Sequence, residues 1–259
     1  MMMDPHDASQ AVFRWIHVVA GILWIGLLYF FNWVNGPFQG KIDAATKKVV
    51  NPELQPRALF FFRWGAAWTW ITGVLLAYLV FYHGKLVLDD PFHPWTAGSI
   101  IMILVSFLAF AVYDPVASSI KDNKQMAAVG FVLTAIVVFG FIYVGGFGYR
   151  GFVIHTGIMF GTLMAANVWM RIWPNQQKIL TATKAGTPPD PALVALAGTR
   201  SRHNTYMSVP LVWAMINNHT TSFAGSSPAM SAIILLIVIA IGWGAVVQIY
   251  KKAATVPGW

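Results

Sequence analysis

The feature that most constrains this chain is a series of seven apolar stretches, each close to the length of a membrane-spanning helix. A helix needs about 20 mostly apolar residues to cross the hydrocarbon of a bilayer, where it satisfies its own backbone hydrogen bonds. The stretches cover residues 11–34, 59–82, 95–117, 126–144, 151–173, 206–223 and 229–250. We therefore predict an all-α fold, a polytopic membrane helix bundle with seven transmembrane helices.

The composition agrees with lipid as the main solvent of the surface. Hydrophobic residues make up 57% of the 259 and charged residues only 10%, whereas soluble domains carry about a quarter charged residues. The net charge of +8 is spread between the apolar stretches, so we expect the lipid bilayer as a partner and no nucleic acid. The chain has no Cys, which excludes disulfides, iron–sulfur clusters and covalently attached c-type heme.

The stretches predict one integral membrane domain over residues 1–259. Residues 174–205 form the one long connection, which we expect to be a cytoplasmic loop with a short helix at 192–198. The sixth stretch is the weakest prediction, because it is short, contains Pro210 and ends in two Asn and His219; a re-entrant segment fits the same pattern. The first ten residues hold no Lys or Arg, so we expect no signal peptide.

The orientation follows from the basic residues of the connections. With the N-terminus outside, the inner connections contain 14 of the 17 Lys and Arg residues. Because cytoplasmic loops carry an excess of Lys and Arg, we predict the N-terminus outside and the C-terminus in the cytoplasm.

Three of the seven histidines lie inside apolar stretches, each near the predicted outer end of its helix. His17 lies about six residues into the first stretch, or ~9 Å at 1.5 Å per residue. His155 lies four residues into the fifth stretch, and His219 lies near the outer end of the sixth. Ionisable residues within a membrane are costly and indicate a functional site by default.

Imidazoles at one depth on separate helices suit a b-type heme, which needs two axial nitrogens and an apolar slot but no covalent attachment. We predict His17 and His155 as the axial ligands of the iron, with His219 as the replacement for either. Gly21 and Trp24 follow His17 by four and seven residues and so share its helix face. A glycine at this position leaves room for a flat macrocycle.

Two arginines accompany the predicted ligands on the outer side. Arg14 lies one turn outward from His17, and Arg150 lies just outward from His155. Heme propionates bind such guanidinium groups, so both are candidate propionate partners. Each assignment has a plainer alternative. The arginines can anchor to phospholipid headgroups, the histidines can be hydrogen-bonded packing residues, and His219 can cap its helix or bind a propionate.

Small residues at four-residue spacing predict close helix packing in two stretches. They are Gly65, Thr69 and Gly73 in the second stretch, and Gly157, Gly161 and Ala165 in the fifth.

A second polar group is predicted near the inner ends of the helices. Arg63 and Asp114 are placed to neutralise each other there. The same level holds Asn32, Asn35, Asn167, Arg171, Arg202, His203 and Asn204. A quinone or proton site fits this pattern, and so does the ordinary polarity of helix ends. The sequence shows no ladder of metal-binding Met or Cys, phosphate loop, nucleophile triad or paired carboxylates, so metal transport and hydrolysis are not expected.

Four blocks of the chain resemble a known family. In order they are WIHVVAGILWIGLLYFFNWVN, FFRWGAAWTWITG, GYRGFVIHTGIMFGTLMAANVWMRIWPNQ and SRHNTYMSVPLVWAMINNH. Together they resemble helices one, two, five and six of the urate oxidase N-terminal family, the membrane domain of PuuD-type urate hydroxylases. The resemblance implies a multi-pass protein of the bacterial inner membrane, related to heme-binding bundles, and the oxidation of urate to 5-hydroxyisourate with onward electron transfer.

Full-length members of that family carry a C-terminal cytochrome c domain. This chain ends at Trp259 without a Cys, so we expect its electron acceptor on a separate cytochrome c or in the quinone pool. The leading hypothesis is a membrane electron-transfer protein with a non-covalent, bis-histidine heme b near the periplasmic side. It would pass electrons between a periplasmic cytochrome c and a membrane partner. The alternatives are a urate hydroxylase with a separate acceptor, and a non-redox accessory subunit of a larger respiratory or photosynthetic complex.

Overall fold

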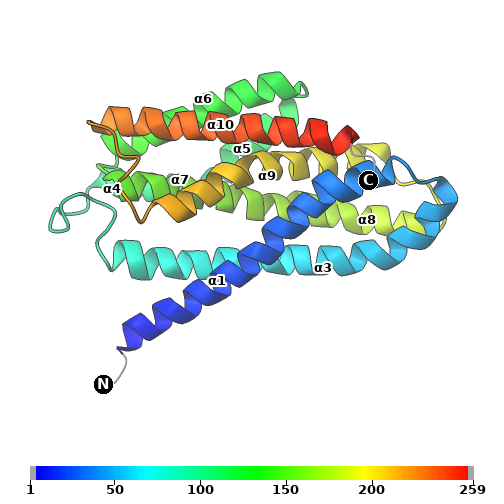
Figure 1. Cartoon of the computed structure of the whole chain (residues 1–259), viewed down its shortest axis with the longest axis horizontal. Helices are drawn as coiled ribbons and strands as arrows, with labels where there is room; N and C mark the ends of the chain where they lie inside the picture. The colour runs from blue at the N-terminus through cyan, green and yellow to red at the C-terminus, as the bar shows by residue number, and fades with distance from the viewer. Residues whose placement is uncertain (1–3, 256–259) are drawn as a thin grey trace. The chain divides into compact units, whose positions relative to one another are not determined.

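The structure is a computed structural model that describes residues 4–255, and every regular element in that range is a helix (Figure 1). Three of the elements, labelled η, are six-residue π-helical segments. The elements are α1 (Pro5–Tyr29), η1 (Phe30–Asn35), α2 (Gly36–Gln39), α3 (Ala44–Leu76), η2 (Ala77–Tyr82), α4 (Ala97–Leu108), α5 (Phe110–Ser119), α6 (Asn123–Tyr143), α7 (Tyr149–Ala166), η3 (Asn167–Ile172), α8 (Trp173–Lys184), α9 (Pro191–Asn217) and α10 (Pro228–Thr255).

Several helices are long and apolar enough to cross a membrane. Within the described residues there are five such helical segments: Pro5–Gln39, Ala44–Tyr82, Asn123–Tyr143, Tyr149–Lys184 and Pro228–Thr255. Helices α4 and α5 would make a sixth if they form one span, bent by 46°. The all-α prediction is therefore confirmed, and the helices are compatible with a multi-pass membrane protein.

The sixth predicted stretch, 206–223, coincides only in part with a helix. Its first residues form the end of α9, which stops at Asn217. The beginning of α9 contains Arg200, Arg202 and His203, so the helix as a whole is less apolar than the five segments above.

The prediction of a long loop over 174–205 is wrong. Helix α8 fills most of its first half, and the short helix expected at 192–198 is the beginning of the 27-residue α9. Only residues 185–190, which include the Pro-Pro pair, separate the two helices. Polarity in a sequence indicates contact with water but does not distinguish a loop from a polar helix, and Gln, Lys and Ala in α8 favour a helix.

The three π-helical segments continue α-helices without a break. Segment η1 extends α1, η2 extends α3, and η3 joins α7 to α8. A π-helical segment adds a residue to the turn, so it changes which side chains face a neighbouring helix, and such segments are frequent at functional sites.

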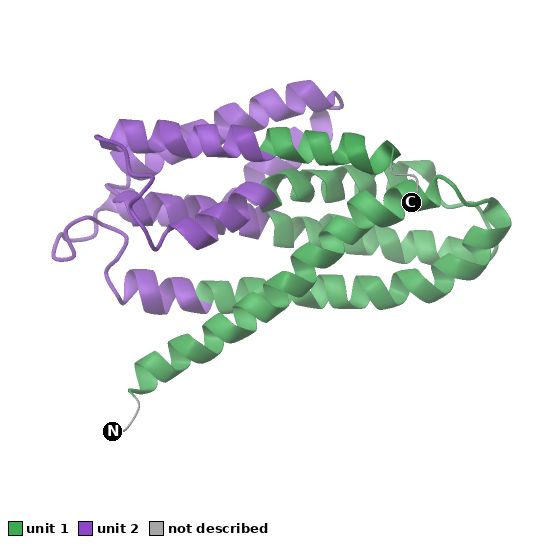
Figure 2. Cartoon of the chain, viewed as in Figure 1, with its two compact units in different colours: residues 1–74, 164–208, 243–259 green, residues 75–163, 209–242 purple. Residues whose placement is uncertain are grey.

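The described chain divides into two compact units (Figure 2). Unit 1 comprises residues 1–74, 164–208 and 243–259, and unit 2 comprises residues 75–163 and 209–242. Each unit is described by itself below.

In unit 1, α1 packs closely on α3 through small residues. A Cβ atom at Gly65 would lie 3.3 Å from the main-chain nitrogen of Trp24, and one at Gly21 would lie 3.7 Å from Thr69. Thus the row Gly65, Thr69 and Gly73 faces α1, as the spacing predicted.

In unit 2, α7 is enclosed by its neighbours. A Cβ atom at Gly157 would meet Met215 at 3.0 Å and Ala214 at 3.3 Å, so this row of small residues allows α7 to approach α9. The beginning of α7 lies against the loop after η2, where a Cβ at Gly151 would collide with the carbonyl of Val87.

Candidate functional site

His17 is held against α3 by two hydrogen-bond acceptors in unit 1. Its Nδ1 lies 2.9 Å from the carbonyl oxygen of Thr69 and 3.2 Å from the hydroxyl oxygen of Thr72. A carbonyl oxygen can only accept, so Nδ1 carries the proton and donates it. In the neutral imidazole the lone pair is therefore on Nε2.

The lone pair of His17 is available for a ligand. Within the described residues Nε2 of His17 has no hydrogen-bond partner, and the side chain is half-buried. The ring fits next to Gly73, where a Cβ atom would lie 3.0 Å from Cε1 of His17. A histidine that ligates a metal almost always donates its other ring N–H to a carbonyl or a similar acceptor, as this one does.

Gly21 and Trp24 share the face of His17, as their spacing predicted, and all three contact α3. Gly21 packs on Thr69, so this glycine serves helix packing. Trp24 is 1% exposed, and its indole Nε1 is a buried donor with no acceptor in the described residues. A buried donor without a partner is costly.

His155 in unit 2 has both ring nitrogens engaged. Its Nδ1 donates to the carbonyl of Gly151 at 2.7 Å, one turn earlier on α7. Its Nε2 lies 3.1 Å from the hydroxyl of Tyr82, which must be the donor because Nδ1 holds the only ring proton. The side chain is 0% exposed, and its ring lies 4.6 Å from that of Phe147 and 5.8 Å from that of Phe141.

In this arrangement the lone pair of His155 accepts from Tyr82, so His155 would have to give up that hydrogen bond to bind an iron. Tyr82 is not among the site residues predicted from the sequence. The signal was weak, since Tyr82 is the last residue of η2 and a π-helical segment is not visible in hydrophobic periodicity.

His219 and Arg150 are brought together in unit 2, where α7 begins and α9 has just ended. A guanidinium nitrogen of Arg150 donates to the main-chain carbonyl of His219 at a long 3.4 Å. Both residues are exposed, and the hydroxyl of neighbouring Tyr149 is buried without a hydrogen-bond partner in the described residues.

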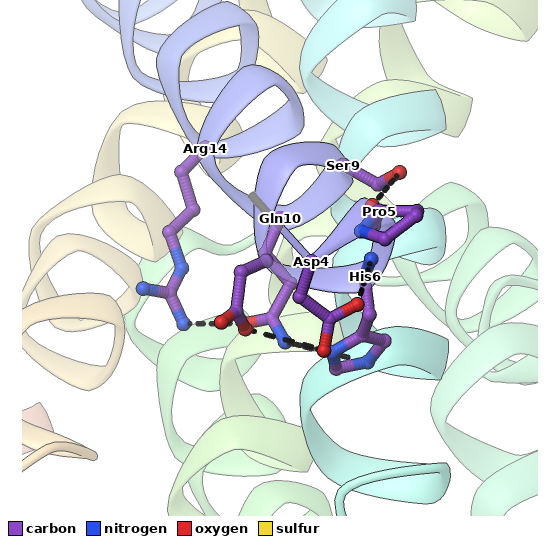
Figure 3. Close-up of polar contacts among 7 residues, drawn as sticks. Asp4, Pro5, His6, Ser9, Gln10 and Arg14 are labelled. Atoms are coloured by element: carbon purple, nitrogen blue, oxygen red, sulfur yellow. Dashed lines mark hydrogen bonds and ion pairs between the residues drawn. The ribbon is translucent and has the colours of Figure 1, made fainter. Parts of the chain in front are cut away.

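Arg14 contacts residues nearer the N-terminus of α1 (Figure 3). Its guanidinium donates to the side-chain oxygen of Gln10 at 3.0 Å, and the amide nitrogen of Gln10 lies 3.1 Å from Nδ1 of His6. These i, i+4 contacts form a short polar ladder that ends at Asp4, the N-cap of the helix. In unit 1 Arg14 thus points along α1 away from His17.

The predicted inner polar group is in large part a buried hydrogen-bond network of unit 1. The amides of Asn167 and Asn204 are joined at 2.8 Å, and both side chains are 0% exposed. Asn32 donates to Ser201 at 2.8 Å and accepts from Tyr250 at 2.9 Å. These contacts link α9 to η1 and η3, and η1 to α10.

The charged residues at this level have separate surroundings. The guanidinium of Arg63 lies 3.8 Å over the ring of Trp173, whereas Asp114 belongs to unit 2. Burial, together with the charges of Arg200 and Arg202, lowers the pKa of His203 to about 4, so this imidazole is neutral at pH 7.

The fold and these contacts define a helical protein compatible with several membrane crossings, in which His17 has one ring nitrogen without a hydrogen-bond partner in the described residues. The family model described as "Urate oxidase N-terminal" matches residues 38–255, and the chain belongs to this family. Helix α1 with His17 precedes the matched range, whereas His155 and His219 lie within it. No curated protein and no solved structure matches the chain.

Proposed function

We propose that this chain is a membrane-embedded, b-type cytochrome-like protein that transfers electrons, with His17 as an axial ligand of a non-covalent heme b. The observation that carries the proposal is the state of His17. Its Nδ1–H is donated to Thr69 and Thr72, and its Nε2 is unengaged. When bound, the heme supplies one-electron exchange at its iron.

The residues around His17 have distinct roles in this proposal. Thr69 and Thr72 fix the tautomer and the ring orientation, and Gly73 leaves space for the ring. Trp24, seven residues after His17, packs on Gly65 of α3. His155 or His219 as the second axial ligand, and Arg14 and Arg150 as propionate partners, stay predictions from the sequence.

The proposal includes the membrane arrangement predicted from the sequence: seven spans in a bacterial inner membrane, with the N-terminus outside. Electrons would pass between a periplasmic cytochrome c, or the quinone pool, and a membrane partner. The long apolar helices support this location.

The test is a reduced-minus-oxidised spectrum of the purified protein with pyridine hemochrome analysis. We expect a b-type signal in the native chain and in His93→Ala, which changes an exposed loop histidine. We expect His17→Ala to lose the heme. A native protein without a Soret band contradicts the proposal and favours the non-redox accessory subunit. Unchanged heme in His17→Ala refutes the ligand assignment.

A second candidate is urate hydroxylation to 5-hydroxyisourate with a separate electron acceptor, which the family membership favours. Its test is anaerobic addition of urate to the oxidised, heme-loaded protein. Reduction of the heme by urate, and not by xanthine, supports the hydroxylase. An oxidised spectrum that persists with urate supports electron transfer alone.

A further inference from the structure

Thr72 is the second hydrogen-bond partner of His17 on α3. Its side chain is 2% exposed, so its hydroxyl has to find its hydrogen-bond partners within the protein. Its Oγ1 lies 2.6 Å from the carbonyl oxygen of Trp68, one turn earlier, and 3.3 Å from that of Thr69. The hydroxyl proton therefore goes to a carbonyl, mainly that of Trp68, because carbonyl oxygens only accept.

Because the hydroxyl proton of Thr72 is donated to a carbonyl, the hydroxyl can only accept a hydrogen bond from the imidazole. Its oxygen, 3.2 Å from Nδ1 of His17, is therefore an acceptor. The N–H of His17 is thus shared between the Thr69 carbonyl and the Thr72 hydroxyl, and the hydroxyl is polarised by its own bond to Trp68. Together these hydrogen bonds draw the Nδ1 proton slightly away from the ring.

We propose that Thr72 is a positioning residue that sets the electron-donor strength of His17 toward a bound iron. The proposal rests on the proposed function. A hydrogen bond from the ring N–H to an acceptor raises the basicity of the ligating nitrogen. A more basic axial nitrogen stabilises ferric over ferrous iron and so lowers the reduction potential. Thr72 acts through His17 and does not contact the iron itself.

The test replaces Thr72 by valine, which has nearly the same shape and no hydroxyl. We expect Thr72→Val to keep the b-type heme but to raise its midpoint potential. We also expect it to weaken heme binding about tenfold, in the range known for residues that support a metal ligand. Thr72→Ser keeps a hydroxyl at the same atom, so it should restore both values toward those of the native chain.

The matched control is Thr134→Val on α6. Thr134 is 6% exposed, and its side-chain hydroxyl donates to the carbonyl of Gly130 at 2.8 Å, one turn earlier on the same helix. Thr134→Val therefore removes a buried threonine hydroxyl of the same kind, and Thr134 is not a hydrogen-bond partner of His17 in the described residues. We expect its midpoint potential to equal that of the native protein.

The outcomes separate the two proposals. A native chain that never binds heme refutes the proposed function and the role of Thr72 with it. Heme that binds through His17 but keeps its potential in Thr72→Val refutes only the role of Thr72. An equal shift in Thr72→Val and Thr134→Val also refutes it, because the loss of any buried threonine hydroxyl would then explain both. Melting temperatures of the heme-free variants show whether each one is folded.

Discussion

His17 and His155 belong to the same residue class and lie at similar depths in the predicted helices, yet they have opposite surroundings. Each donates its Nδ1–H to a main-chain carbonyl, His17 to Thr69 on another helix and His155 to its own helix. In the helical segment that contains His17, 11% of an 18-residue apolar stretch is buried. In the segment that contains His155, the buried share of such a stretch is 83%. Depth along a helix therefore does not define a ligand, whereas the engagement of Nε2 distinguishes the two residues.

The largest expected difference between the two histidines is in stability. His155→Ala empties a fully buried site and leaves the Tyr82 hydroxyl and the Gly151 carbonyl without their partner. We expect a loss of about 3 kcal/mol in the free energy of unfolding. His17→Ala removes a half-buried ring and should cost about 1 kcal/mol.

Thermal and denaturant unfolding of both heme-free variants in detergent measures this difference. If His17→Ala proves as destabilising as His155→Ala, then His17 has a structural role like that of His155. The contrast between the two sites would then be lost.

A smaller effect is expected where α3 makes room for the His17 ring. A Cβ at Gly73 would lie 3.0 Å from Cε1 of His17, so Gly73→Ala should displace the ring from the Thr69 carbonyl. We expect heme affinity to fall about tenfold, as when a supporting contact of a ligand is lost. Gly161→Ala is the control, because its nearest neighbour, Leu211, lies 3.9 Å away. Heme titration monitored at the Soret band compares them, and equal affinities would show that the ring position is not limiting.

The sequence predicted one of these sites better than the other. Helical spacing predicts that His17, Gly21 and Trp24 lie on one face of their helix. The row of small residues that includes Gly65 and Gly73 predicts a surface on which another helix packs closely. That these two surfaces face each other was not predictable, because local patterns do not say which helices are adjacent. Thr72 was missed for that reason.

The surroundings of His155 were less predictable for a different reason. Its contact with Tyr82 depends on η2, where the turn is wider than in an α-helix. The spacing of an ideal α-helix therefore places the side chain of Tyr82 on a different face of its helix. The helices within residues 174–205 were not predictable, because a polar helix such as α8 lacks the apolar pattern that identifies a span. The all-α class was predictable, since hydrophobic length alone determines it.

The smallest expected effect concerns the hydroxyl of Tyr82, which binds Nε2 of His155 and has no counterpart at His17. Tyr82→Phe removes the donor to Nε2 of His155 and little volume, so it should cost about 1 kcal/mol of stability. Tyr143→Phe, with an exposed ring, is the control and should cost nothing measurable. In a double-mutant cycle with His155→Ala, the two changes should be coupled by a similar amount, because they remove the same bond.

The same variant sharpens the ligand question. Tyr82→Phe leaves the lone pair of His155 without its donor, as that of His17 already is. If the heme spectrum of Tyr82→Phe becomes more low-spin than that of the native chain, and His155→Ala in the same background reverses it, then the hydroxyl is what keeps His155 from the iron. If the spectrum is unchanged while the stability falls, the Tyr82–His155 pair is purely structural. The second axial ligand must then be sought at His219 or elsewhere.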